Sequence, residues 1–225
     1  MLIGAKHLTR ILIAFSVLVT ASESWAEDHA VGKVVEVKGQ VLGLRGTQSS
    51  PLSKGSVVYG NERIVTKADS TAILLLGNDA AILVKPDSDL NLDQDKMKDW
   101  RLDLKTGGVL STVRSYPKRP DYFRIKSKNA VMGVRGTVFF VEAKPKEPLY
   151  VCTCKGTVSI KDPASNSEFV AVSKHHDQPK TIRDGSGDIK SRLLAEIQKD
   201  HADSEADRLV KLLWKQPKSE DLMAK

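Results

Sequence analysis

Residues 129–142 read N-A-V-M-G-V-R-G-T-V-F-F-V-E, and this stretch indicates a β fold. Its β-branched and aromatic residues, such as Val138 and Phe140, favour extended strands. Gly133 and Gly136 interrupt the pattern, and glycine permits backbone angles that other side chains forbid. The stretch therefore predicts two strands that meet at a tight bend.

Arg135 lies between these two glycines, so we expect it to have a role at the bend. As a structural residue it would lie across the bend and donate to backbone carbonyls or to an acid such as Asp121. As a binding residue it would hold an anionic group or a partner's carboxylate. The structural role is the favoured interpretation, and Thr137 is predicted to cap the bend by hydrogen bonding back to it.

Short runs of Val, Ile and Leu, broken by glycine, recur between residues 32 and 172. Together with an aromatic content of only 5%, they predict many short strands rather than a core of large aromatic side chains. Residue patterns alone are compatible with either a β-sandwich or a stacked solenoid.

The order of these runs resembles that of the FecR domain, a periplasmic module of iron-uptake signalling proteins. The resemblance covers about 130 residues and rests on G-V-R-G-T at 133–137 and on five upstream segments. These are G-K-V-V-E-V-K-G-Q-V at 32–41, L-S-K-G-S-V-V-Y-G-N-E-R-I-V-T at 52–66, S-T-A-I-L-L-L-G-N-D-A-A-I-L-V-K-P-D-S-D-L-N-L at 70–92, W-R-L-D-L-K-T-G-G-V-L-S-T-V at 100–113 and Y-F-R-I-K-S at 122–127. It implies a mainly β fold, elongated and β-solenoid-like or a twisted stack of short strands, to which the sequence after residue 187 adds a C-terminal α-helical segment.

The amino terminus has the pattern of an export signal. Lys6 and Arg10 precede an apolar run at 11–19, and the small residues Ser24 and Ala26 occupy the two positions that a signal peptidase recognises. The alternative is a retained membrane anchor, although the run is shorter than the roughly 20 residues that a bilayer span needs. We expect cleavage after Ala26, a periplasmic or secreted protein, and no stable membrane insertion after signal removal.

Composition excludes two classes of function. Removal of residues 1–26 leaves 33 basic and 27 acidic residues, a net charge of +6 that is spread along the chain. No aromatic residues interleave a basic tract, so nucleic acid is not an expected partner. The chain also contains no G-x-S-x-G elbow, H-E-x-x-H motif or phosphate-binding glycine loop, and we expect no enzymatic activity.

Composition changes after residue 187, which predicts three parts: a signal peptide at 1–26, a FecR-like β domain at 27–184, and a helical appendage with a polar tail at 185–225. Two apolar faces recur at helical spacing in the appendage: Ile189, Leu193, Ile197 and then Ala206, Leu209, Val210, Leu213. The favoured interpretation is a lid over one end of the β body, which would protect a strand edge. The alternative is a helix that docks on a partner.

Cysteine usage gives the candidate site. Cys152 and Cys154 are two residues apart in a predicted strand and should therefore point to the same face. His175 and His176 follow a strand that can pair with it, whereas His201 is expected to stand apart on the helical segment. Three interpretations stay open: a disulfide, small apolar packing residues beside a solvated histidine pair, or a metal site for zinc or copper.

The function that these patterns favour is a non-catalytic binding and scaffolding module of the cell envelope, with another envelope protein as its partner. FecR-domain proteins that signal carry an anti-sigma segment and a transmembrane helix where this chain has an export signal. The alternatives are a periplasmic metal-binding sensor, or a component of a transport or surface-signalling assembly that docks through the helical appendage.

Overall fold

The computed structural model describes residues 29–95, 98–119, 122–185 and 187–216. The described residues form fifteen strands and two helices, and all the strands belong to one sheet. The predicted mainly β class with a C-terminal helix is therefore confirmed. The predicted signal peptide at 1–26 lies outside the described residues.

The sheet folds into two facing layers, here called layer A and layer B. Three long strands run through both layers: β9 (Trp100–Val113), β11 (Ala130–Ala143) and β12 (Leu149–Asp162). Each gives one half to each layer, since its two halves pair with different strands. The other strands of layer A are β4 (Val57–Tyr59), β1 (Ala30–Lys38), β6 (Thr71–Leu76), β7 (Ala80–Val84), β14 (Gln178–Ile182) and β15 (Leu193–Ala195). Those of layer B are β3 (Gln48–Pro51), β2 (Val41–Arg45), β5 (Arg63–Thr66), β8 (Asp89–Gln94), β10 (Phe123–Ser127) and β13 (Ser167–Ser173).

Glycines lie where the long strands bend from one layer to the other. Gly136 in β11 has φ +58° and Gly156 in β12 has φ +107°, both in the left-handed region that favours glycine. The two bends pack closely, because a Cβ at Gly156 would lie 2.7 Å from the carbonyl oxygen of Gly136. The bend predicted in the G-V-R-G-T stretch is thus present, within one continuous strand.

Two apolar clusters hold the fold. The larger one fills the space between the layers and includes Trp100, Phe123 and Phe139, all with no exposed surface. The second covers the outer face of layer A, where Leu75 and Leu83 lie on the side opposite the main core. The runs T-A-I-L-L-L of β6 and A-A-I-L-V of β7 are apolar at nearly every position because both of their faces are covered.

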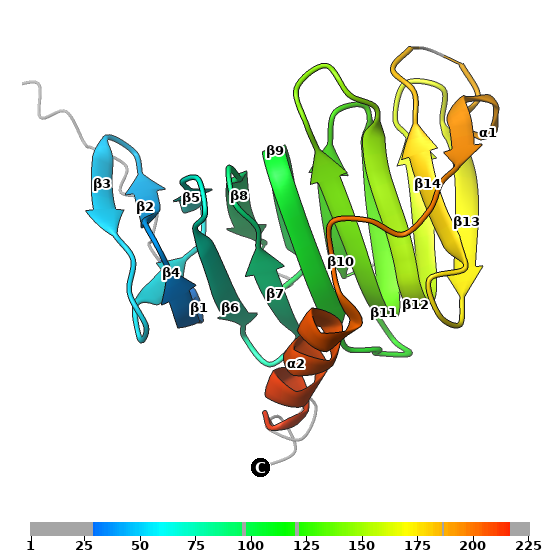
Figure 1. Ribbon diagram of the computed structural model, residues 1–225. Helices are drawn as coiled ribbons and strands as arrows, with labels where there is room; N and C mark the ends of the chain where they lie inside the picture. The colour runs from blue at the N-terminus through cyan, green and yellow to red at the C-terminus, as the bar shows by residue number, and fades with distance from the viewer. Residues whose placement is uncertain (1–28, 96–97, 120–121, 186, 217–225) are drawn as a thin grey trace, which may run out of the picture.

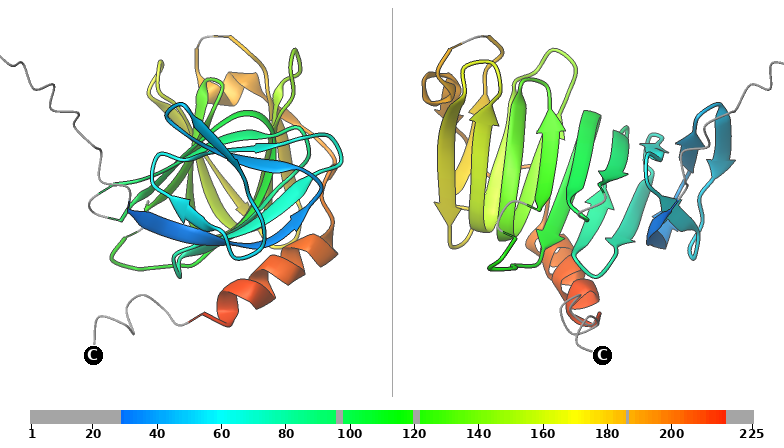
Figure 2. Two further views of the ribbon diagram at one scale, coloured as in Figure 1. Left: turned by 90° about the vertical axis from the view of Figure 1, so that its left-hand side faces the viewer. Right: turned by 180° about the vertical axis from the view of Figure 1, so that it is seen from behind.

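The strands form an elongated stack that runs from β3 and β4 at one end to β13 and β14 at the other (Figure 1). Figure 2 shows the stack end-on, with strands on both sides of the core. The solenoid-like form is not confirmed: the sheet is not closed, and only the β10–β9 pairing among the described strands is parallel. The coils of a β-solenoid stack in parallel, whereas here neighbouring strands alternate in direction.

The appendage differs from the expected continuous helix. Helix α1 (Ile189–Arg192) is a single turn, and the chain then forms β15, in which Leu193 pairs with Ile182 of β14. The edge of β14 offers backbone hydrogen-bond partners to residues 193–195. Ile197, which was predicted to lie on a helical apolar face, is 74% exposed. A helix there would bury too little apolar surface to form.

Helix α2 (Asp203–Trp214) confirms the second helical pattern, since Ala206, Leu209 and Leu213 are buried. It lies on the outer face of layer A, over β7 and β9, rather than over an end of the stack (Figure 1). The predicted lid over one end of the β body is thus corrected, because α2 covers an apolar face of the sheet instead. The strand edge of β14 is instead covered by β15.

Candidate metal centre

The two cysteines lie on the outer face of layer A. They belong to the first half of β12, where they join the second apolar cluster, and their exposed fractions are 0% for Cys152 and 2% for Cys154. Both are free thiols in the structure. Two positions apart on one strand, they face the same side of the sheet, as predicted.

Two imidazoles close the site. His176 lies in the turn between β13 and β14, and its Nδ1 is 3.4 Å from Sγ of Cys152. His201 lies just before α2, and its Nε2 is 3.4 Å from Sγ of Cys154 and 3.3 Å from Nδ1 of His176. The four ligand atoms all lie within 4.8 Å of one another, and three of the residues are buried while His176 is half-buried.

His175 does not belong to this set. Its side chain is 75% exposed, and its Nε2 lies 3.6 Å from Oδ2 of Asp203. The chain turns sharply at His176, whose φ is +47°, so the two adjacent rings point to different surroundings. The predicted set of Cys152, Cys154, His175 and His176 is thus corrected, because His201 stands where His175 was expected.

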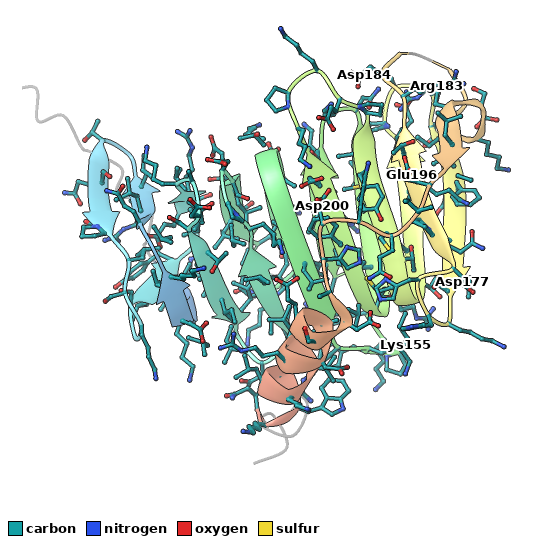
Figure 3. The ribbon with its side chains drawn as sticks, in the orientation of Figure 1. Lys155, Asp177, Arg183, Asp184, Glu196 and Asp200 are labelled. Carbon is teal, nitrogen blue, oxygen red and sulfur yellow. The ribbon has the colours of Figure 1, made fainter. Side chains whose placement is uncertain are left out.

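The sequence did not predict His201 as a ligand, because this residue was expected to stand apart on the helical segment. Its position is 47 residues after Cys154, and no motif spacing links the two. Only the path of residues 196–202, here called the arm, brings it to the cysteines. Figure 3 shows this arm crossing in front of the sheet, with the labelled Asp200 on it and Lys155 of β12 below.

Each histidine is oriented by a hydrogen bond from its other ring nitrogen. Nε2 of His176 lies 2.7 Å from Oδ1 of Asp203, and Nδ1 of His201 lies 2.7 Å from the carbonyl oxygen of Lys199. These oxygens can only accept, so the nitrogens facing them carry the hydrogens. The other two nitrogens, Nδ1 of His176 and Nε2 of His201, face the thiols. Metal-binding histidines are usually held in this way, by a carboxylate or a backbone carbonyl behind the ring.

The two thiols differ in pKa. The hydrogen bond from Cys154 lowers the pKa of Cys152 well below its usual value, against the effect of burial, and the two imidazoles lower it further. The same hydrogen bond, together with burial, raises the pKa of Cys154. Cys152 is therefore the thiol that ionises more readily, and the thiolate is the form of cysteine that binds metals.

The distances fit a tetrahedral ion. With metal–sulfur bonds of about 2.3 Å and metal–nitrogen bonds of about 2.0–2.1 Å, a tetrahedron requires S···N separations of about 3.5 Å and an N···N separation of about 3.3 Å. Two of the four S···N separations are 3.4 Å and the N···N separation is 3.3 Å, and the other separations are within 4.8 Å. These three of the six edges agree with a tetrahedron around a zinc-sized ion.

The residues of the G-V-R-G-T motif lie apart from this centre and serve the bend. The hydroxyl of Thr137 lies 2.8 Å from the carbonyl oxygens of Arg135 and Thr157, and it accepts from the Thr157 backbone N–H at 3.0 Å. Arg135 is exposed, and Gly133 pairs with Arg124 of β10. Asp121, the acid suggested as a partner of Arg135, lies outside the described residues.

Comparisons with known proteins confirm the family resemblance over part of the chain. Residues 62–159 match the family model described as FecR protein, from β5 through most of β12. The match includes Cys152 and Cys154 but ends before His176 and His201. A comparison with curated proteins finds no match.

Two solved structures are similar in part. Both are crystal structures of a "putative anti-sigma factor" from Parabacteroides distasonis ATCC 8503, at 2.50 Å and 1.65 Å resolution. Each has a TM-score of 0.49 and 14% sequence identity, and the similarity covers 60% of this chain and 59% of the other. Among the described residues, neither helix has the length and hydropathy that a bilayer span requires.

Proposed function

Because residues 62–159 match the FecR family model, we propose that this chain is a non-catalytic regulatory module of the cell envelope that binds a thiophilic metal ion. The ligands are Cys152, Cys154, His176 and His201. The observation that carries the proposal is the convergence of their four ligand atoms within 4.8 Å. Thiolates and imidazoles together favour zinc or copper over the hard ions magnesium and calcium.

The alternative interpretations of the cysteines have less support. In a packing role the histidines would be solvated, but the side chain of His176 is only 7% exposed and His201 is 8% exposed. A disulfide between residues two apart on one strand would be strained. A single metal ion would bind all four of these ligand atoms.

The envelope location and the scaffolding role form part of the same proposal. Location rests on the signal pattern at residues 11–26, and the protein partner rests on the FecR match. In this proposal the two-layered stack is a rigid support that presents its surface to another envelope protein. Co-purification from envelope extracts, with and without residues 188–225, tests whether the appendage takes part in that contact.

Metal binding is tested on reduced, full-length protein that has been freed of metal and dialysed against zinc or against copper(I). Elemental analysis should find about one ion per chain. Cys152→Ser should abolish the binding, because it removes the thiolate. His175→Ala is the matched control: it removes a neighbouring histidine outside the ligand set and should leave the stoichiometry unchanged. Protein that takes up no metal contradicts the proposal.

A further inference from the structure

The four ligands come from two separately placed parts of the chain. Cys152 and Cys154 belong to β12, and the turn that carries His176 is fixed to the same strand by a hydrogen bond from the His176 N–H to the Cys154 carbonyl oxygen, at 2.9 Å. His201 alone comes from the arm at 196–202. Three ligands are therefore preset by the sheet, whereas the fourth depends on the position of the arm.

The arm is otherwise attached by a few hydrogen bonds and by ion pairs at the surface. The Glu196 N–H donates to the Pro179 carbonyl oxygen at 3.1 Å. The Tyr150 hydroxyl donates to the Ile197 carbonyl oxygen at 3.0 Å and accepts from the Lys199 N–H at 3.2 Å. Asp200 forms an ion pair with Lys144 at 3.2 Å, and both side chains are about 40% exposed. An exposed ion pair contributes little to stability. The one buried side chain of the arm is His201, stacked on Phe140 with ring centroids 4.6 Å apart.

Helix α2 begins directly after the arm. Its first residue, Asp203, holds His176, and its buried residues Leu209 and Leu213 cover the outer apolar cluster of layer A. A ligand bond to His201 therefore fixes the arm and the first turn of α2 together. The metal centre lies at the point where the appendage meets the FecR domain.

We propose that the ion is zinc(II) and that it acts as a clasp, fastening the arm and the start of α2 to layer A. This inference rests on the proposed metal-binding function. Cys152, Cys154 and His201 are buried, and the His176 side chain is only 7% exposed. Four protein ligands of two thiols and two imidazoles leave no open coordination position, which is typical of structural zinc sites. Tetrahedral S₂N₂ sets favour zinc, whereas copper(II) prefers tetragonal geometry.

The clasp couples metal binding to the position of the arm. Zinc binds the closed form more tightly than the open form, because only the closed form supplies His201. If the closed form binds zinc about 100 times more tightly than the open form, saturating zinc lowers the ratio of open to closed form about 100-fold. By the same linkage, closing the arm raises the affinity for zinc by the same factor.

Hydrogen exchange measured by mass spectrometry tests the clasp on the full-length, reduced protein. Zinc at 100 times Kd should slow the exchange of backbone amides in residues 196–207 by up to about 100-fold. His201→Ala should lose this protection while still binding zinc weakly through three ligands. His175→Ala should keep both the binding and the protection, since its side chain lies outside the set.

The outcomes separate the two proposals. One zinc per chain with unchanged exchange in residues 196–207 overturns the clasp and leaves the metal-binding function standing. Absence of metal uptake overturns both, and uptake of copper(I) without zinc overturns the identity of the ion. Should His201→Ala fail to fold, His201→Asn, which keeps a donor for the Lys199 carbonyl, takes its place; full zinc protection in a folded His201 variant overturns the clasp.

Discussion

Oδ1 of Asp203 lies 2.7 Å from Nε2 of His176, on the side of the ring away from the thiols. The first residue of α2 thus sets which nitrogen of this histidine is free to bind a metal. Carboxylates in this position raise the basicity of the ligand and hold its ring in place.

Removal of that carboxylate should weaken metal binding. Asp203→Ala is expected to raise the Kd for zinc about 10- to 100-fold, the usual effect of losing a carboxylate behind a ligating histidine. Competition with a chromophoric chelator measures the change. Asp207→Ala is the control, because Asp207 is an exposed acid one turn further along α2. If Asp203→Ala and Asp207→Ala raised the Kd for zinc equally, the effect would come from the negative charge of α2 and not from the contact with His176.

Gly136 should tolerate no side chain. Its φ is +58°, and a Cβ there would lie 2.8 Å from Cβ of Ser115. Gly136→Val should therefore destabilise the fold by more than the roughly 1 kcal/mol of an ordinary glycine replacement. Gly46 has nearly the same φ, +55°, but nothing lies within 4 Å of the position that a Cβ would take. Gly46→Val therefore measures the cost of the left-handed backbone alone, without the steric clash. Thermal melting compares the two, and the bend explanation fails if their midpoints fall equally.

The sequence predicted the part of the site that depends on local spacing. Alternation along a strand places Cys152 and Cys154 on one face whatever the rest of the fold does. The turn at His176, which the following Asp177 and Pro179 favour, also follows from neighbouring residues. The β class and the helix at 203–214 were predictable for the same reason, because apolar periodicity is a local signal.

What the sequence could not predict depends on tertiary placement. His201 reaches the thiols because β15 pairs with β14 and sends the arm back across layer A. That pairing overrides the helical spacing of Ile189, Leu193 and Ile197, since an open strand edge offers hydrogen bonds that a short, solvated helix lacks. The solenoid-like form is not confirmed, and short apolar runs do not reveal the direction of neighbouring strands.

The export signal predicts the start of the mature chain at Glu27. The apolar run at 11–19 and the small residues Ser24 and Ala26 are the basis for cleavage after Ala26. Intact-mass measurement on protein from the envelope fraction should show the loss of residues 1–26. Ala26→Arg should block the cleavage, because a large charged side chain does not fit the small-residue position. A native mass that retains residues 1–26 would instead indicate an anchor.

The far end of α2 is held by Arg114, independently of the metal centre. Its Nη2 donates to the Leu213 carbonyl oxygen at 2.6 Å, the side chain is only 5% exposed, and its guanidinium lies 4.8 Å from the ring centre of Trp214. A cation at a helix C-terminus also interacts favourably with the helix dipole. Arg114→Ala should therefore loosen the last turn of α2 and cost about 1.5–3 kcal/mol of stability.

Arg208→Ala is the matched control, because Arg208 pairs with Glu36 at the surface, where the two side chains are 53% and 42% exposed. Its loss should cost less than about 1 kcal/mol. Thermal melting measures both, and hydrogen exchange should show faster exchange of the last turn of α2 in Arg114→Ala alone. The Kd for zinc should stay unchanged in Arg114→Ala, since the clasp fixes only the start of the helix. A large loss of zinc affinity in this variant would mean that the whole of α2, rather than the arm, positions His201.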